Sequence, residues 1–466
     1  MIAEYRTAFG NYSRDIRLML LVSATLAFTV DGVFPVVFNL YILRMGYGPE
    51  FVGTVNSVAL IVFSLSSLVA GSLGMRYGAR PVMILGVMVA GLTTAALALS
   101  DLMPRTIQPA WLITMFSVMY LGVAFFFVNV APALVSVTTG AERSRVISIQ
   151  SAMNNLLAFV GGPVAGFVPL LLVSLLGWST HAPATYRVPL VISIGLFVVA
   201  AVLILRVHIH PIEGDEVTSG GRTGGRTGGR TGARAGAPTV GVSFLSILLV
   251  LSLVRFLTSF GIGAGLTFFN VYMDDALGVP TSTIGLIIAT SHLLSVFSAL
   301  TVPRIVARWG AANSAIGGSF AAGLTLLPMA LIPLWPVGGL SFVTMGAISS
   351  VRYSSYFVYM MEVTPARFRT TMAGAGEFSG GMGFAIVSLV GGFTIVRFGY
   401  GVLFVGAGLT TILGGLMLLA YVLWRKAHDA RPIPLQPSLA LAADVTESTP
   451  DSDTDSAAAG ATDEIA

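Results

Sequence analysis

The ten residues Gly71-Ser72-Leu73-Gly74-Met75-Arg76-Tyr77-Gly78-Ala79-Arg80 form a short loop between two long apolar runs of the chain. The centre of this loop occurs again 232 positions further on, where Arg308 and Gly310 stand in the places of Arg76 and Gly78. Arginines at the end of an apolar run, with a glycine that allows a tight turn, are typical of a connection between transmembrane helices. The recurrence predicts a fold of two similar halves.

The composition of the chain excludes an ordinary soluble protein. Of its 466 residues, 55% are hydrophobic and 10% are charged, whereas soluble proteins carry about 25% charged residues. Runs of about 20 apolar residues are long enough to cross the hydrocarbon core of a membrane. We therefore expect an all-α polytopic membrane protein with twelve transmembrane helices. The expected spans are 16–43, 49–73, 81–100, 110–138, 146–176, 188–207, 243–273, 281–302, 313–334, 337–361, 370–396 and 400–424.

The region between the sixth and seventh spans divides the helices into two equal sets. It contains three copies of Gly-Gly-Arg-Thr, a composition typical of a flexible tether. The alternative is that its arginines bind anionic lipid or make a regulatory contact. The last forty residues are rich in Asp and Glu, which predicts a disordered acidic tail. The expected organisation is an N-terminal segment 1–15, a bundle 16–207, a linker 208–242, a bundle 243–426 and a tail 427–466.

Basic residues are concentrated on one side of the expected membrane. If both termini are cytoplasmic, 19 of the 25 Lys and Arg residues lie on the cytoplasmic side and four lie on the other. This positive-inside asymmetry also supports an even number of spans. We expect a multi-pass protein of the cell's inner (plasma) membrane with both termini in the cytoplasm.

Other residues also recur between the halves, which gives them the same orientation. The recurring sets are Asn39-Leu40-Tyr41 with Asn270-Val271-Tyr272, Gly53 and Gly86 with Gly285 and Gly318, and Arg143-x-Arg145 with Arg367-x-Arg369. Two parallel repeats joined by a loop are an architecture that can rock about a central site.

The loop 71–80 resembles the Gly-x-x-x-Asp-Arg-x-Gly-Arg-Arg signature of the major facilitator superfamily of secondary transporters, and the resemblance covers residues 16–424. It matches at Gly71, Arg76 and Gly78. The family's fold is two six-helix bundles related by pseudo-two-fold symmetry.

The sequence departs from this signature at two places. Met75 stands where the family has an Asp that helps to hold the cytoplasmic gate, and Arg80 alone remains of the basic pair. The second half keeps only Arg308 and Gly310. The resemblance implies a gating role for these loops, and topological anchoring is the alternative for Arg80.

The fifth span contains Gly161-Gly162-Pro163-Val164-Ala165-Gly166, which is similar to the family's Gly-Pro-x-x-Gly motif. In the family this motif is associated mainly with exporters that exchange substrate for protons. Small residues also let helices approach closely, and proline bends a helix. Gly162, Pro163 and Gly166 therefore indicate either proton-driven efflux or helix packing alone.

Five ionisable residues lie inside the expected spans: Asp31, Arg255, His292, Arg352 and Glu377. Such residues are costly in a membrane unless they are paired or hydrated, so they are candidates for substrate binding or proton coupling. The resemblance implies that spans 1, 2, 4, 5, 7, 8, 10 and 11 line a central cavity, and all five residues lie on these spans.

Each of these residues also has a structural interpretation. Asp31 can exchange a proton or can cap a bent helix near Gly32. Arg255 needs a carboxylate partner or an anionic substrate. His292 can simply pack. At about 1.5 Å per residue, Arg352 and Glu377 lie at similar depth, so we expect them to form an ion pair, either static or broken during transport.

Amides and one phenol add hydrogen-bonding groups to the lining spans. They are Asn39, Asn56, Asn129, Asn154, Asn155, Asn270 and Tyr272. The repeated Asn39 and Asn270 can equally hold helix ends. The sequence contains no cluster with metal-ligand spacing, no nucleotide-binding Walker loop and no cysteine, so we expect no metal and no cofactor.

These patterns predict a secondary transporter of a small molecule that works by alternating access, coupled to protons through Asp31 and Glu377. The motif in the fifth span favours efflux. We expect a monomer in the lipid bilayer that binds no nucleic acid. An uncoupled facilitator is the near alternative, and a transporter-like sensor is the alternative from another class. An intramembrane enzyme would need a catalytic constellation, which the sequence lacks.

Overall fold

The computed structural model describes residues 12–138, 140–179, 181–207, 242–365 and 368–428. The N-terminal half consists of α2 (Arg14–Ala27), the π-helix η1 (Phe28–Val33), α3 (Phe34–Arg44), α4 (Pro49–Tyr77), α5 (Ala79–Ala98), the 3-10 turn η2 (Ser100–Leu102), α6 (Gln108–Ser136), α7 (Gly140–Leu176) and α8 (Pro183–Leu205). The C-terminal half consists of α9 (Val242–Val271), the π-helix η3 (Tyr272–Ala276), α10 (Thr281–Trp309), α11 (Ala311–Leu331), α12 (Trp335–Val363), α13 (Arg369–Phe398) and α14 (Tyr400–His428).

Some predictions fall on the rest of the chain. The tether predicted for 208–242 lies outside the described residues except for Val242. The acidic tail predicted for 427–466 lies outside them from residue 429 onward. The same holds for residues 1–11 and for Arg367, and nothing is described of the side chains of Arg143 and Arg145.

The described helices confirm an all-α polytopic membrane protein. Eleven stretches are long and apolar enough to cross a membrane, the first of them the continuous run Arg14–Arg44. The 29-residue α12 is not among the eleven. Its middle carries Arg352 and several Ser and Tyr residues, and the cavity described below shows why this helix is less apolar than the others.

The chain divides into two compact units, Met1–Val422 and Leu423–Ala466. The first contains α2–α13 and most of α14. Of the second, the described residues are the last turns of α14.

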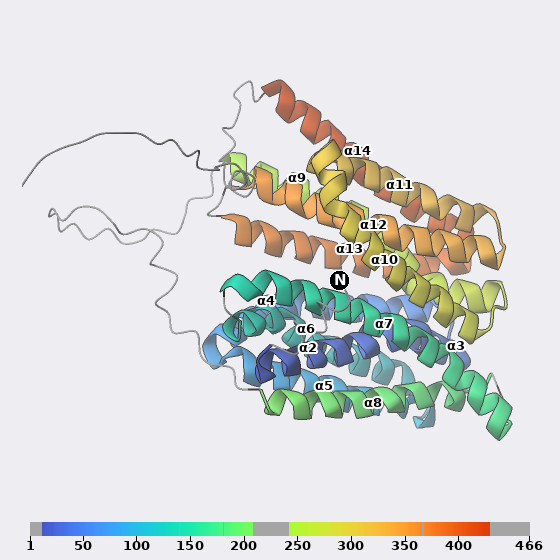
Figure 1. The fold of residues 1–466 in the computed structure, drawn as a ribbon. Coiled ribbons are helices and arrows are strands. Elements are labelled where there is room, and N and C mark those ends of the chain that lie inside the picture. The colour runs from blue at the N-terminus through green and yellow to red at the C-terminus, as the bar shows by residue number, and fades with distance from the viewer. Residues whose placement is uncertain (1–11, 139, 180, 208–241, 366–367, 429–466) are drawn as a thin grey trace, which may run out of the picture. The chain divides into compact units, whose positions relative to one another are not determined.

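Within the first unit the helices form two bundles, α2–α8 and α9–α13 with the start of α14 (Figure 1). Across the interface α4 packs against α13, α7 packs against α10, and α3 contacts α9. We call the end of the bundles where α8 ends and α9 begins the linker side, and the end where α3 ends and α4 begins the loop side.

Proline residues in the first turn help to set where several helices begin. Pro49, Pro183 and Pro336 lie at the start of α4, α8 and α12, all on the loop side. The first turn of a helix leaves its N–H groups unpaired, so a proline there loses no hydrogen bond and presets the backbone angle.

Candidate solute-binding cavity

A cavity of about 650 Å³ lies between the two bundles. Its lining comes from η1, α3, α4 and α6 of the first half and from α9, α10, α12 and α13 of the second. These are seven of the eight spans that we expected to line a cavity. The volume is in the range of small-molecule sites, which is about 300–1,000 Å³.

All five predicted ionisable residues line this cavity: Asp31, Arg255, His292, Arg352 and Glu377. Arg255 and Arg352 are 8% and 3% exposed, on α9 and α12. The Arg255 guanidinium lies over the Tyr353 ring, 4.8 Å from its centroid, and its Nη1 donates to Ser259 Oγ at 3.2 Å. The two arginines and Glu377 thus form a charged region in the wall contributed by the second bundle.

The predicted ion pair between Arg352 and Glu377 is not formed in this structure, and that prediction was wrong for this conformation. The Glu377 carboxylate instead accepts a hydrogen bond of 2.6 Å from the hydroxyl of Tyr353, the next residue after Arg352 on α12. The residue of α12 that contacts Glu377 is therefore Tyr353, one position after the predicted Arg352.

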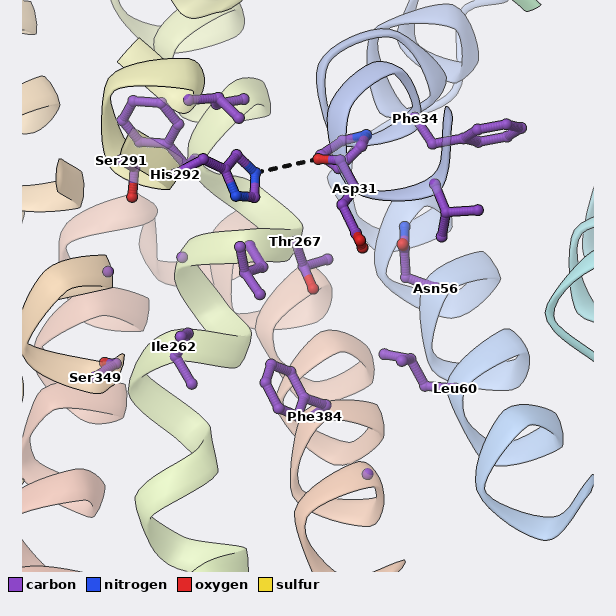
Figure 2. Close-up of a pocket in the computed structure, with 18 of the residues that line it drawn as sticks. Asp31, Phe34, Asn56, Leu60, Ile262, Thr267, Ser291, His292, Ser349 and Phe384 are labelled. Carbon is purple, nitrogen blue, oxygen red and sulfur yellow. Dashed lines mark hydrogen bonds between the residues drawn. The ribbon is translucent and has the colours of Figure 1, made fainter. Parts of the chain in front are cut away.

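Asp31 lies within the π-helix η1, where a backbone of i to i+5 hydrogen bonds widens the first span. His292 Nε2 on α10 bonds the main-chain oxygen of Asp31 at 3.2 Å, which requires Nε2 to carry the proton. The Asp31 carboxylate points away from this ring and into the cavity (Figure 2). Asp31 therefore belongs to a local irregularity of the helix and presents its carboxylate to the cavity, and its role in proton exchange stays a prediction.

A second, polar pocket of about 370 Å³ shares Asp31 and His292 with the central cavity. Its other lining residues come from α7: Gln150, Ser151, Asn154, Asn155 and Ala158. Asn154 lies between the main-chain oxygens of Gln150 and Ser23. The fifth span, which is the remaining one of the eight expected to line a cavity, therefore lines this side pocket. Asp31 lines both cavities.

On the loop side the two bundles are joined by hydrogen bonds between repeated residues. Asn39 Nδ2 donates to the main-chain oxygen of Thr267 at 2.8 Å, and Asn270 Nδ2 donates to that of Pro35 at 2.7 Å. Asn56 on α4 donates to Asn39 Oδ1 at 2.9 Å. Asn39 and Asn270 therefore hold the ends of α3 and α9 together at the edge of the cavity.

An ion pair strengthens this contact nearer the loop-side surface. Arg44 donates to both carboxylate oxygens of Asp274, at 2.7 and 2.5 Å, and also to the Tyr186 hydroxyl at 3.3 Å. Tyr186 in turn lies 3.0 Å from Thr281 Oγ1 on α10. We call the contacts of Asn39, Asn270, Arg44 and Asp274 the loop-side clasp. The cross-bundle hydrogen bonds described here all lie at mid-depth or nearer the loop side.

Comparison with known proteins places this architecture. The sequence profile of the Major Facilitator Superfamily matches residues 20–386 and, in a second overlapping match, residues 251–447. The chain belongs to the Major Facilitator Superfamily. No curated protein sequence matches the chain.

Solved structures of Major Facilitator Superfamily transporters share the fold at low sequence identity. A mutant of the nucleoside transporter NupG superposes with a TM-score of 0.67 at 13% identity, covering 87% of this chain and 99% of that chain. The inward-open xylose transporter XylE from E. coli gives 0.67 at 12%, covering 87% and 95%. A structure described as a D-xylose-proton symporter gives 0.64 at 12%, covering 86% and 95%.

In both halves the loop that carries the Major Facilitator Superfamily motif forms a tight turn between two helices. Gly78 and Gly310 have φ of +90° and +80°, a region that other L residues rarely adopt, and they connect α4 to α5 and α10 to α11. Arg80 Nη2 donates to the main-chain oxygen of Leu205 at 2.5 Å, so it caps the end of α8. Arg76 and Arg308 lie exposed on the linker side.

Two other residues of this loop show where the chain agrees with the family signature and where it differs from it. Met75, in the place of the family's Asp, is 86% exposed. A β-carbon added at Gly71 would lie in ordinary contact with Val128, so Gly71 packs α4 beside α6. With no carboxylate at position 75, the loop has no acid there to pair with an arginine of another helix.

The glycines of the fifth span pack against the second bundle. A β-carbon added at Gly162 would lie 2.8 Å from the main-chain oxygen of Gly285 on α10, and one added at Gly166 would lie 2.7 Å from that of Thr281. Pro163 lies between them inside α7. The motif therefore fulfils the packing interpretation, and its relation to transport direction stays a prediction.

The same contact recurs at the symmetry-related interface. Gly53 of α4, which corresponds to Gly285 in the repeat, packs against Gly392 of α13, and a β-carbon at Gly392 would lie 2.6 Å from the main-chain oxygen of Pro49. The sequence repeat of Gly53 and Gly285 thus marks two equivalent close approaches between the bundles.

Two predicted polar residues lie outside both cavities. Asn129 Nδ2 donates to the main-chain oxygen of Ala70 at 3.1 Å and joins α6 to α4 within the first bundle. The Tyr272 hydroxyl donates to the main-chain oxygen of Met329 at 3.2 Å and joins η3 to α11 within the second bundle. These groups stabilise helix packing.

Sequence reasoning missed the aromatic character of the cavity. Phe34, Phe38 and Phe116 form a stack in its wall, with Phe38 and Phe116 ring centroids 4.0 Å apart, and Tyr120 packs edge-on against Phe116 at 4.9 Å. The i, i+4 spacing of Phe34 with Phe38 and of Phe116 with Tyr120 was the available signal. Aromatic residues are so common in membrane helices that this spacing alone does not separate a cavity face from a packing face.

Proposed function

We propose that this member of the Major Facilitator Superfamily is a secondary active transporter that moves a small solute through the central cavity by alternating access. The observation that carries the proposal is the placement of that cavity between two repeated bundles, with its loop-side edge held by a clasp across the interface. Rocking of the bundles about the glycine contacts would break the clasp and open the loop side.

We also propose that protons drive the transport, with Asp31 and Glu377 as the groups that take up and release them. Their carboxylates lie on opposite bundles and both line the cavity, so a proton on either one changes the charge of the wall. Asp31 is also reached from the side pocket. The likeness to a structure named as a proton symporter supports coupling, although it establishes the fold alone.

The count of basic residues supports a cytoplasmic linker side. We propose that the protein works as a monomer in the plasma membrane. In that orientation the present structure is the one whose cavity is closed toward the outside. The Gly-Pro-x-x-Gly motif favours efflux in exchange for protons.

The test is a luminal pH measurement that needs no labelled solute. Purified protein is reconstituted in liposomes loaded with the pH dye pyranine, and sugars, nucleosides, amino acids and aromatic acids are added in turn. Proton coupling predicts that at least one solute changes luminal pH, and that an imposed pH gradient drives that solute against its concentration gradient. Solute flux that ignores the pH gradient would support an uncoupled facilitator, and absence of any flux would support a sensor.

The first prediction concerns the two acids. Asp31→Asn and Glu377→Gln keep size and polarity but remove the exchangeable proton, so each should lower gradient-driven flux at least tenfold. Counterflow of the same solute, which needs no proton, should persist. Glu362→Gln is the matched control, because Glu362 is an exposed acid of α12 outside the cavity. Normal gradient-driven flux in both acid variants would contradict the assignment.

A further inference from the structure

Arg352 is a buried cation that makes no hydrogen bond or ion pair with any described residue. Its side chain is 3% exposed, its Nε has no partner, and its Cβ packs so tightly on α11 that a β-carbon at Gly318 would lie 2.9 Å from it. A guanidinium stays charged in proteins, and a buried charge without a partner is strongly unfavourable. The helix packing holds the arginine at the cavity wall in spite of this cost.

Arg255 is in a similar position on the neighbouring α9. It has one hydrogen bond, to the neutral Ser259 hydroxyl, and its Nε is also buried without a partner. Its guanidinium packs on Gly380 of α13, where an added β-carbon would lie 2.9 Å from Cζ. Arg255 and Arg352 lie on contacting helices, α9 and α12, and both line the central cavity. Two cations therefore share one region of the cavity wall.

Glu377 does not neutralise this pair. Its carboxylate accepts from the Tyr353 hydroxyl at 2.6 Å, and neither arginine forms an ion pair with it. Tyr353 contacts both groups, because its hydroxyl bonds the carboxylate and the Arg255 guanidinium lies over its ring. The guanidinium N–H groups of Arg352, and those of Arg255 that do not bond Ser259, are thus left for a group that enters the cavity.

The aromatic residues that line the cavity indicate what the rest of the bound solute is like. Phe34, Phe38 and Phe116 face the cavity from the first bundle, and Phe269 and Phe342 of the second stack on each other with centroids 3.9 Å apart. An aromatic lining favours a solute with an apolar, aromatic body, and guanidinium groups favour carboxylate or phosphate because they bind two oxygens at once.

We infer that the transported solute is an organic anion with a flat apolar body, whose oxyanion group is bound by Arg255 and Arg352. The inference rests on the proposed function, because it names the substrate class of the same cavity. A carboxylate and a phosphonate offer the same oxyanion chemistry, and the experiment compares them.

The experiment measures binding by the full-length protein in detergent, through the shift of its unfolding temperature. The probes are benzoate, naphthalene-2-carboxylate and phenylphosphonate, and naphthalene-2-carboxamide serves as the neutral isostere. We expect at least one anion to raise the unfolding temperature in a saturable way, and the amide to bind at least tenfold more weakly. Equal shifts for the amide and the acid, or no shift with any anion, would overturn the inference.

Variants locate the binding. Arg255→Gln and Arg352→Gln should each weaken anion affinity at least tenfold, whereas Arg397→Gln, an exposed arginine at the loop-side end of α13, should leave it unchanged. Glu377→Gln removes a negative charge beside the site and should tighten anion binding. This gain of affinity is a result that loss of folding cannot produce. Unchanged affinity in both cavity arginine variants would contradict the site.

Failure of this inference is distinguishable from failure of the proposed function. The binding measurement needs no membrane and no gradient, so anion binding without flux in liposomes would leave the inference standing and reject transport. Proton-coupled flux of a neutral solute, with no binding of the anions, would leave transport standing and reject the inference.

Discussion

Arg352 and Arg187 carry the same guanidinium group, but their surroundings differ. Arg187 on α8 forms an ion pair with Asp101 near the loop side. Arg352 lies deeper and has no acidic partner among the described residues. Removing one partner of a buried ion pair leaves an uncompensated charge and is destabilising, whereas removing an unpaired buried charge relieves its cost. The effect of replacing each arginine on the unfolding temperature therefore distinguishes a structural charge, Arg187, from a functional one, Arg352.

We predict that Arg352→Met raises the unfolding temperature of the empty protein. The substitution removes a buried, unpaired charge and fills the space with an apolar side chain, which we expect to stabilise by about 1–4 kcal/mol. Arg187→Met is the control and should lower the unfolding temperature, because it leaves the Asp101 carboxylate with only the Tyr41 hydroxyl and without its cationic partner. Both are measured by thermal unfolding in detergent without solute. A fall in stability for Arg352→Met would mean that this arginine has a structural partner.

Single residues also show how far the sequence was informative about the site. The depth of a residue follows from the rise per residue, so the sequence predicts Arg352 and Glu377 at similar depth, and both line the central cavity. The rotation of a helix about its axis depends on the packing of all its neighbours. That rotation puts Tyr353 in contact with Glu377, and the polar pattern of α12 does not reveal it.

At the scale of elements, the bundles meet through glycines that bring backbones into contact. The repeat had marked Gly53 and Gly285 as equivalent before any partner was known, and both turned out to lie at the cross-bundle interface. Helix positions were predictable because membrane spans are long apolar runs. The π-helices η1 and η3 were not, because an extra residue in one turn leaves no mark on an apolar pattern.

We predict that Gly285→Val destabilises the protein while Gly317→Val does not. A β-carbon at Gly285 would lie 2.5 Å from the main-chain oxygen of Gly162, so α7 and α10 would have to separate. Such overpacking costs about 1–3 kcal/mol. Gly317 on α11 has nothing within 4 Å of an added β-carbon. Thermal unfolding of both variants checks this, and equal stability would show that the interface can adjust freely.

At the scale of the whole molecule, the loop-side clasp decides which conformation the bundles favour. Arg44 and Asp274 have side chains 15% and 10% exposed, so their ion pair is shielded from solvent more than a surface pair. Weakening it should shift the equilibrium toward a state open on the loop side. The chain has no cysteine, so a single introduced cysteine reports this opening without background.

We predict that Asp274→Asn increases the labelling of a cysteine placed at Leu60, a residue of α4 that lines the cavity. A loss of about 1 kcal/mol corresponds to about a fivefold increase in the rate of labelling by a membrane-impermeant thiol reagent added to intact cells. Asp275→Asn is the neighbouring control, because Asp275 accepts a hydrogen bond from Tyr400 within its own bundle. The same labelling rate in the two variants would argue against a clasp at Asp274.

The amide bonds of Asn39 and Asn270 have a consequence for the kinetics of opening. A longer hydrogen bond of 3.4 Å joins Asn39 Nδ2 to Asn270 Oδ1. The two shorter bonds each run from one amide to a main-chain oxygen of the opposite helix, so neither of these two requires the other side chain. The two bonds can break one after the other, and each step then has a smaller barrier than the simultaneous loss of both. A mutation that removes one amide leaves the main-chain bond of the other amide in place. Substitution at either position would therefore change the rate of opening and closing before it prevented closure of the loop side.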